Sequence, residues 1–338
     1  MSVQNADSLF DYAWYLKNGC LVKGIRKNNL KVFSTFACGG GSTMGYKLAG
    51  FDVIAANDID PQMQAVYVKN HNPKHFYLCP VKELLNMELP KELYNLDILD
   101  GSPPCSVFSV VGQRDKNWGK AKKFREGQSK QVLDDLFFDF ISLVEKLKPK
   151  VVVAENVKGM ITGNAKGYCK MIDERFSKVG YNVQFFLLNA ATMGVPQSRE
   201  RVFFICSRKD LIFSKLKMEF NYKQIPFSKI SDETDQTKNI TELTEKYWDG
   251  ARDGESVGKF KSRKKVWSTR PLPTIIASNR NYHNKFKREL NDRELFLGGT
   301  FPLDYDFMKI DPNYLIGMSV PPVMMAQIAY QIYLQWFL

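Results

Sequence analysis

The chain has 338 residues, of which 44% are hydrophobic and 25% are charged, a balance typical of a protein with a packed core. This length suffices for one large domain, or for a large domain that carries a smaller one. No apolar run approaches the roughly 20 residues that a bilayer crossing needs, and the N-terminal segment lacks a signal-peptide pattern. We therefore expect a cytoplasmic protein without a membrane-spanning segment.

The cysteine and histidine content argues against a disulfide framework and against a structural zinc site. The six cysteines stand at positions 20, 38, 79, 105, 169 and 206, and no two of them have CxxC spacing. The chain has only three histidines. Such a pattern in a chain of this size is typical of free thiols in a reducing compartment, so we expect no metal site.

The formal net charge of +12 favours a polyanionic partner. Residues 112–130 hold seven basic and two acidic side chains, and residues 258–270 hold six basic and no acidic ones. Both stretches lack helical periodicity, so we interpret them as exposed loops. Such loops either contact phosphates or form an ordinary solvated face.

Alternating strands and helices are predicted between residues 31 and 207. The predicted strands cover residues 31–37, 51–56, 96–101, 151–155, 181–188 and 201–207. Helices are expected after a glycine-rich turn at 39–41, from Pro61, and over 132–147, where apolar residues recur at helical spacing. This pattern predicts an α/β domain of Rossmann type, with a mostly parallel sheet covered on both faces.

The alternation is lost after residue 207. The polar segment 208–269 predicts a smaller second lobe, and residues 270–338 are expected to return to the first domain and to end in an apolar helix. Residues 1–30 are predicted to form a helical extension with no assigned role.

Two segments at predicted strand ends indicate a nucleotide-like cofactor, because ligands of open α/β sheets bind at the carboxyl ends of strands. Residues 36–41 (FACGGG) follow the first strand, and their glycines allow a close backbone approach to a ligand. Asp58 follows the second strand, where an acid commonly binds ribose hydroxyls. Both a dinucleotide and S-adenosylmethionine contain such an adenosine group.

Cys105 is the candidate nucleophile. It follows Pro103 and Pro104 at the end of a predicted strand, and the basic stretch 112–130 comes next. Rigid prolines and nearby cations are conditions that expose a thiol and lower its pKa. A lone cysteine is usually structural, but this placement favours a reactive one.

Charged side chains at two further strand ends complete the candidate site. Glu155 closes an apolar strand, where a carboxylate is costly unless it is partnered or functional. Arg199 and Arg201 precede the last strand and, in extended geometry, point to the same face. Their alternative interpretation is an ordinary surface ion pair with Glu200.

From residue 31 to its C-terminus, the chain resembles the DNA cytosine-5 methyltransferase family. The PPC with Phe108 and Ser109, the ENV at 155–157 and the QxRxR at 197–201 occur in the family's order and approximate spacing. The segments RPLPT at 270–274 and GMSVPP at 317–322 resemble its last two motifs. Residues 208–269 occupy the place of its target-recognition region.

The resemblance implies methyl transfer from S-adenosylmethionine to C5 of a cytosine that is flipped out of duplex DNA. Cys105 would attack C6 and form a covalent intermediate, which makes C5 nucleophilic. Glu155 would bind or protonate the ring near N3, and Arg201, with Arg199 beside it, would bind the exocyclic oxygen.

The resemblance also implies binding residues and partners. The implied cofactor-binding residues are Phe36, Gly39, Gly40, Gly41, Asp58, Ile59, Pro104, Ser319 and Val320. The implied DNA-binding residues are Gln197, Lys120, Lys122 and Arg125. We expect a monomer of bacterial or phage origin that acts on double-stranded DNA, with a cognate restriction nuclease as a possible partner.

Three residues depart from the family pattern around the cofactor. Cys38 stands where the family usually has a glycine, Pro80 where an acid often accepts from the adenine amine, and Met318 where an asparagine is usual. Since all three surround one ligand, they predict an altered affinity for the cofactor. Met318 is expected against its methionine part.

Four alternatives remain open. An RNA cytosine-5 methyltransferase would use the same scaffold and the same catalytic residues, and a cofactor-impaired homologue would bind DNA without methylating it. A nicotinamide dehydrogenase would leave Cys105, Glu155 and Arg201 without a purpose. A thiol hydrolase would need a histidine beside Cys105.

Overall fold

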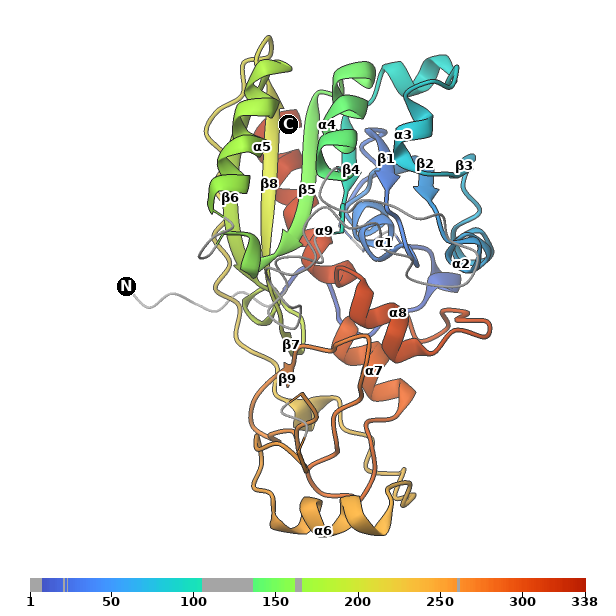
Figure 1. Ribbon diagram of the computed structural model, residues 1–338, viewed down its shortest axis with the longest axis vertical. Coiled ribbons are helices and arrows are strands. Elements are labelled where there is room, and N and C mark those ends of the chain that lie inside the picture. Colours follow the sequence, from blue (N-terminus) through green and yellow to red (C-terminus); the bar gives the residue numbers. More distant parts are fainter. Residues whose placement is uncertain (1–7, 21, 23, 105–135, 162–165, 260–261) are drawn as a thin grey trace.

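The structure is a computed structural model that describes residues 8–20, 22, 24–104, 136–161, 166–259 and 262–338. A twisted sheet with helices on both faces forms the larger part, and a lobe containing α6 hangs below it (Figure 1). The sheet order is β3-β2-β1-β4-β5-β8-β6. Its strands are β1 Lys31–Thr35, β2 Asp52–Asp58, β3 His75–Leu78, β4 Ile98–Gly101, β5 Val151–Val157, β6 Tyr181–Asn189 and β8 Glu200–Arg208.

The sheet is mostly parallel, which confirms the predicted fold class. Strands β1 to β5 pair in parallel, whereas β8 runs antiparallel to both β5 and β6. Strand β3 was not predicted, and β1 is shorter than expected. It ends at Thr35 because Phe36 and Cys38 take left-handed backbone conformations, with φ of +52° and +48°.

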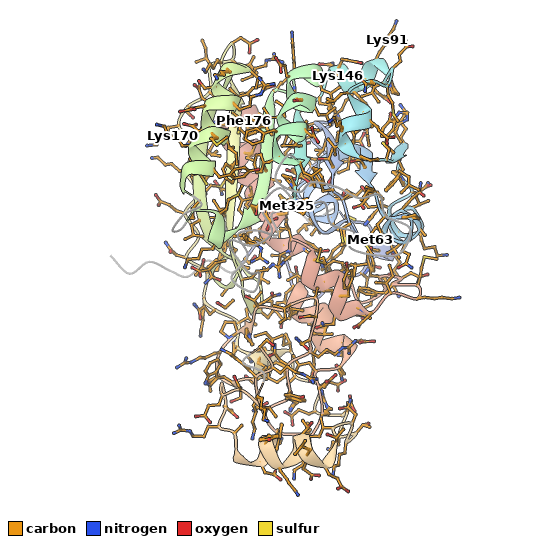
Figure 2. The ribbon with its side chains drawn as sticks, in the orientation of Figure 1. Met63, Lys91, Lys146, Lys170, Phe176 and Met325 are labelled. Atoms are coloured by element: carbon orange, nitrogen blue, oxygen red, sulfur yellow. The ribbon has the colours of Figure 1, made fainter. Side chains whose placement is uncertain are left out.

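Helices cover both faces because each buried strand alternates its side chains between two cores. On one face Phe33 and Val152 pack with α3, α4 and α5, and on the other Val32 and Val153 pack with α1 and α9. Figure 2 shows Phe176 of α5 and Met325 of α9, which belong to the two different cores. The helices are α1 Gly41–Leu48, α2 Pro61–His71, α3 Val81–Leu84, α4 Leu136–Leu147, α5 Lys166–Lys178 and α9 Pro322–Ile332.

The C-terminal segment packs as a core helix. By length and composition the run Pro312–Phe337, which includes α8 Pro312–Met318 and α9, could cross a membrane, but 78% of its apolar window is buried inside the fold. Helix α9 lies against α1 at Gly45, where a Cβ would come within 2.5 Å of the Met325 Cβ. This close approach buries most of α9 beside the sheet.

The predicted helical extension at the N-terminus is wrong for the residues that the structure describes. Between residues 8 and 30 they contain one 3-10 turn, Leu16–Asn18. The Trp14 indole N–H donates to the Thr300 carbonyl, and the main-chain N–H groups of Leu16 and Lys17 donate to Asp304. Tertiary partners satisfy these polar groups in place of helical hydrogen bonds.

The lower lobe draws on residues from both sides of position 269. It contains α6 Glu242–Gly250, and the short parallel pair β7 Gln197–Ser198 and β9 Leu272–Pro273 joins it to the sheet. Tyr282 packs with Trp248 and Val257, and its carbonyl accepts from the Val266 N–H. Part of the segment expected in the first domain therefore packs in this lobe, before α7 Asp292–Gly299 begins.

A buried ion pair organises the lobe. The Arg288 guanidinium donates to both carboxylate oxygens of Glu294 at 2.8 Å, and both side chains are fully buried. Glu294 also accepts from the main-chain N–H groups of Asn291 and Asp232. The pair therefore connects the start of α7 to the segment that follows residue 230.

We predict that Arg288→Met destabilises the lobe by about 3–5 kcal/mol, because it leaves the Glu294 carboxylate buried without a counter-charge. Urea unfolding followed by tryptophan fluorescence measures the change. Lys285→Ala removes a cation from an exposed pair with Glu233 and is the control, with little expected effect. Equal stabilities of the two variants would contradict the prediction.

Candidate active site at the carboxyl edge of the sheet

Glu155 and Arg201 meet because β8 runs antiparallel to β5. The register pairs Val157 with Arg201, so Glu155 and Arg201 project from the same face on neighbouring strands. The Arg201 Nε and the Glu155 Oε1 form an ion pair at 2.9 Å, and side-chain exposures of 15% and 11% leave both groups partly accessible. The sequence predicted that these two residues lie together, and the geometry brings them together.

The pair retains unused hydrogen-bonding atoms. Arg201 donates through Nη1 to the Glu200 carbonyl. Within the described part of the chain, neither the Glu155 Oε2 nor the Arg201 Nη2 forms a hydrogen bond. The pair can therefore offer one acceptor and one donor to a planar polar ring. The alternative of a surface ion pair with Glu200 is wrong, because the Glu200 carboxylate pairs with Lys158 at 2.9 Å.

Arg199 has a different environment from Arg201. It is 2% exposed, and its two terminal nitrogens donate to the carbonyls of Ile275 and Gly317, each at 3.0 Å. Burial, together with the charge of Arg201, lowers the pKa of Arg199. The structure therefore corrects the expectation that Arg199 offers its terminal nitrogens to a substrate oxygen. They connect main-chain segments that are far apart in the sequence.

Gln197 was expected to contact DNA, and the structure corrects this as well. It is 1% exposed, its Nε2 donates to the Gly298 carbonyl at 3.1 Å, and its Oε1 accepts from the Ile275 N–H at 3.0 Å. Because both ends of the amide are bound to main chain, Gln197 belongs to the junction between sheet and lobe.

Asn156 holds the segment that leads to Cys105. Its Nδ2 donates to the Pro103 carbonyl at 3.0 Å, and its side chain is buried. Cys105 itself lies outside the described residues, as do Lys120, Lys122 and Arg125. Pro104, the last described residue before Cys105, is exposed. No role was predicted for Asn156 from the sequence, although it lies in the segment that resembles a family motif.

The glycine-rich turn after β1 is fixed by Asp58. One carboxylate oxygen accepts from the Cys38 N–H at 2.8 Å, and the other accepts from the Asp60 N–H at 2.9 Å. Burial raises the pKa of Asp58. A carboxylate has about four acceptor positions, so these two bonds leave capacity for ribose hydroxyls.

His71 and Tyr305 hold the same turn through the Gly39 carbonyl, and neither residue was predicted from the sequence to do so. The Gly39 carbonyl accepts from the His71 Nε2 at 3.2 Å and from the Tyr305 hydroxyl at 2.5 Å. Burial lowers the pKa of His71 to about 3, so the ring is neutral and carries its proton on Nε2. Gly40, with φ +81°, lies so close that a Cβ would be 2.2 Å from this nitrogen.

Ser319 and Val320 border the turn from the C-terminal side. A Cβ on Gly41 would lie 2.3 Å from the Val320 carbonyl oxygen and 3.0 Å from the Ser319 Cβ. The side chain of Met318 is 55% exposed at the end of α8. The structure therefore brings together the glycines, Asp58, Ser319 and Val320, as the sequence predicted.

The chemistry of this edge fits an adenosine-bearing ligand. Asp58 offers acceptors for hydroxyls, and half-exposed apolar side chains from Phe36, Ile59 and Pro80 follow β1, β2 and β3. Apolar groups of this kind suit the faces of a purine ring. No acid stands at position 80 to accept from an adenine amine.

Burial keeps the thiols of the described residues protonated. It raises the pKa of Cys38 to about 12, and those of Cys79 and Cys169 to about 11. The pKa values of Cys20 and Cys206 are raised as well. These five cysteines are therefore poor nucleophiles at neutral pH.

Asp100 is a second buried acid on the same face as Glu155. It is 1% exposed and accepts from the Ser34 hydroxyl at 2.9 Å and from the Tyr46 hydroxyl at 3.2 Å. Burial raises its pKa to about 7, and the charge of Glu155 adds to the shift. No sequence pattern drew attention to this residue, since it stands inside a strand.

The family model for C-5 cytosine-specific DNA methylases matches residues 30–334. The Type II methyltransferase M.FnuDI of Fusobacterium nucleatum is 35% identical over 235 residues, which are 69% of this chain and 59% of that protein. M.NgoPII of Neisseria gonorrhoeae is 31% identical over 222 residues, 66% of this chain and 57% of the relative. The chain thus spans less than two thirds of these relatives. M1.HphI of Haemophilus parahaemolyticus is 26% identical over 330 residues, covering 89% and 86%.

Solved structures share the fold. A prophage-encoded protein of E. coli, described as a DNA modification methyltransferase, superposes with a TM-score of 0.70 at 20% identity, over 92% of this chain and all of that one. The Spodoptera frugiperda protein DNMT2 gives a TM-score of 0.62 at 17% identity, over 90% and 100%. At these identities the likeness concerns the fold alone.

We predict that Gly40→Ala destabilises the protein more than Gly180→Ala. Both glycines have positive φ, so both variants incur about 1–2 kcal/mol of backbone strain. A Cβ at Gly180 meets nothing within 4 Å, whereas one at Gly40 collides with His71. Thermal unfolding measures the difference. Adding His71→Ala to Gly40→Ala should remove part of it, and an absence of such rescue would contradict the contact.

Asp100→Asn should stabilise the protein increasingly as the pH rises. The folded protein keeps a proton on Asp100 up to about pH 7, whereas the unfolded chain releases it near pH 3.9. Stability of the native chain therefore falls between these values. The gain in the free energy of unfolding of the variant, measured by urea unfolding, should grow from pH 4 to pH 7, at about 1.4 kcal/mol per pH unit at most, and then level off. Asp52→Asn, at an exposed position, is the control. A stability gain of Asp100→Asn that does not depend on pH would contradict the prediction.

Proposed function

Because the chain belongs to the C-5 cytosine-specific DNA methylase family, we propose that it transfers a methyl group from S-adenosylmethionine to C5 of a cytosine in duplex DNA. The observation that carries this proposal is the Glu155–Arg201 pair at the carboxyl edge of the sheet, where the Glu155 Oε2 and the Arg201 Nη2 form no hydrogen bond with any described residue. Cytosine presents complementary groups at N3, N4 and O2. The edge lies beside the segment that leads to Cys105.

The reaction proceeds through the thiolate of Cys105. The sulfur adds to C6, which pushes the C5–C6 electrons toward the ring and makes C5 nucleophilic. When bound, S-adenosylmethionine would supply the methyl group to C5, and the sulfur–methyl bond would break to leave S-adenosylhomocysteine. Loss of the C5 proton to a base restores the C5–C6 double bond and expels the thiolate. The raised pKa values of the five described cysteines support Cys105 as the nucleophile.

Glu155 and Arg201 stabilise the ring while the sulfur adds. Glu155 binds the N3 side and supplies or shares a proton there, which withdraws the electrons that arrive from C6. Arg201 donates from Nη2 to the exocyclic oxygen, where negative charge develops. Their mutual ion pair fixes the geometry of both groups before the substrate arrives.

Arg199 and Gln197 act as positioning residues in this proposal. Each binds the Ile275 main chain, and Arg199 also binds the Gly317 carbonyl close to Ser319. They hold the start of β8, and with it Arg201, at a fixed place relative to the cofactor edge. A shift of about 1 Å at such a distance from the reacting atoms is enough to reduce rates strongly.

The cofactor is held by the glycine-rich turn at 39–41, by Asp58 at the ribose, by Ser319 and Val320, and by Phe36, Ile59 and Pro104. Cys38, Pro80 and Met318 change the side chains around it. Because C6 is shielded in stacked DNA, the cytosine must be flipped out of the duplex. Lys120, Lys122 and Arg125 would hold phosphates. The protein acts as a monomer in the cytoplasm, and a cognate nuclease is a possible partner.

The test is a covalent trap. With 5-fluorocytosine at the target position, C5 has no proton to lose, so the thiolate is not expelled after methyl transfer. Wild-type protein with S-adenosylmethionine should remain attached to duplex DNA on a denaturing gel, and Cys105→Ala should abolish both adduct and methylation. Cys169→Ala is the matched control and should still form the adduct.

Two outcomes would overturn this mechanism. One is an adduct that persists in Cys105→Ala, and the other is a wild-type protein that methylates DNA without ever forming the adduct. A parallel reaction with structured RNA distinguishes the substrate, since adduct formation on RNA alone would assign the same chemistry to a different nucleic acid.

A further inference from the structure

A cavity of about 540 Å³ lies where the lower lobe meets the sheet. Its wall includes Ser198 of β7, Thr274 after β9, and Lys264, Trp267 and Arg270 of the lobe. Figure 1 shows β7 and β9 at this junction. The Thr274 hydroxyl donates to the Ser198 carbonyl at 2.7 Å, and Ser198 directly precedes Arg199. The cavity therefore adjoins the segment that carries Arg201 into the candidate active site.

The cavity wall carries basic side chains without acidic neighbours. Several basic side chains elsewhere in the lobe have acidic partners, in the pairs Arg252–Glu255, Arg263–Glu289, Lys285–Glu233, Lys287–Glu245 and Arg288–Glu294. No acidic residue is found among the described residues of the wall. Within the same described set, Lys264 and Arg270 form no ion pair. These cations are left available for an external acceptor.

Asn281 orients a second donor into the cavity. It is 4% exposed, and its Oδ1 accepts from the main-chain N–H of Lys264 at 2.9 Å. This bond fixes the amide so that Nδ2 is the free end, and none of the described residues accepts from it. The Lys264 Nζ and the Asn281 Nδ2 therefore come from two residues that are linked to each other.

Trp267 gives the cavity a rigid apolar side. The Arg270 guanidinium lies over its ring, 4.9 Å from the centroid. Gly254 packs so tightly on the indole that a Cβ there would overlap it. The tryptophan is thus held in place by Gly254 on the lobe side, and it supports an exposed cation next to the two donors.

We propose that this cavity recognises a guanine close to the target cytosine, with Lys264 and Asn281 donating to its major-groove edge. Guanine is the base that presents two neighbouring acceptors there, O6 and N7, whereas adenine and cytosine present a donor and thymine a methyl group. Arg270, supported by Trp267, contacts a backbone phosphate. This inference rests on the proposed function and names the base that the site selects.

The residues that select the guanine extend beyond the predicted target-recognition segment. The segment expected to recognise the target, residues 208–269, supplies Lys264 but not Asn281 or Arg270. A chimera that exchanges 208–269 alone would separate Lys264 from the amide that its own main chain orients. Specificity should move fully only when residues up to 281 are exchanged together.

The experiment methylates a library of duplexes in which random bases flank a cytosine, and maps the products by bisulfite sequencing. Wild-type protein should methylate cytosines that have an invariant guanine at one nearby position. Lys264→Ala should lower the preference for that guanine about tenfold or more. Lys264→Gln should shift the preference toward adenine, because a glutamine amide matches the adenine N6 and N7. Lys246→Ala removes an exposed lysine from α6 and is the matched control, with unchanged specificity.

The outcomes separate the two proposals. A wild-type protein that methylates no duplex would overturn the proposed function, and the inference with it. A wild-type protein that methylates duplexes without a fixed nearby guanine would overturn only the inference. The same holds if both Lys264 variants keep the wild-type preference.

Discussion

The candidate site depends on one constraint of the sheet, the antiparallel insertion of β8 beside β5. In a fully parallel sheet the N-terminal end of β8 would lie at the opposite edge, far from the end of β5. The reversal brings Arg201 opposite Val157 and within 2.9 Å of the Glu155 carboxylate. The pairing of a carboxylate and a guanidinium is therefore a property of strand direction, and it places two charged groups at an otherwise apolar strand end.

Residues 197–201 connect this pair to the rest of the molecule. Gln197 and Arg199 are buried and bind main-chain groups of residues 275, 298 and 317, whereas Ser198 lines the junction cavity. Because these hydrogen bonds go to main-chain groups, they hold the partner segments in place independently of the side chains that those segments carry. The short strand β7 thus connects the lobe, the segment at residue 317 and Arg201, so the junction cavity and the candidate active site are held in a fixed geometry relative to each other.

The sequence predicted the sheet because its buried strands are short apolar runs, and it predicted the Glu155–Arg201 neighbourhood because both follow such runs. Strand β3, with the mixed sequence HFYL and partial burial, has no such signal. Gln197 and Arg199 were predicted to contact DNA and the substrate, because the carbonyls that hold them in the interior lie 76 to 118 residues away in the sequence. The roles of Asp100 and His71 were not predicted for the same reason, because their hydrogen-bond partners lie in other elements.

Three residues near the glycine-rich turn depart from the family pattern, and these departures change side chains without changing the course of the backbone. Cys38 adopts φ +48°, a conformation that favours glycine, but its N–H is held by Asp58 and its thiol is protonated. Pro80 precedes α3 in an extended conformation that suits proline, and Met318 is exposed at the end of α8. Gly40 has no such freedom, because His71 fills the space of a side chain. Position 38 therefore accommodates a cysteine, whereas a side chain at position 40 would collide with the His71 ring, so the turn keeps its backbone through the glycine that has no room for a Cβ.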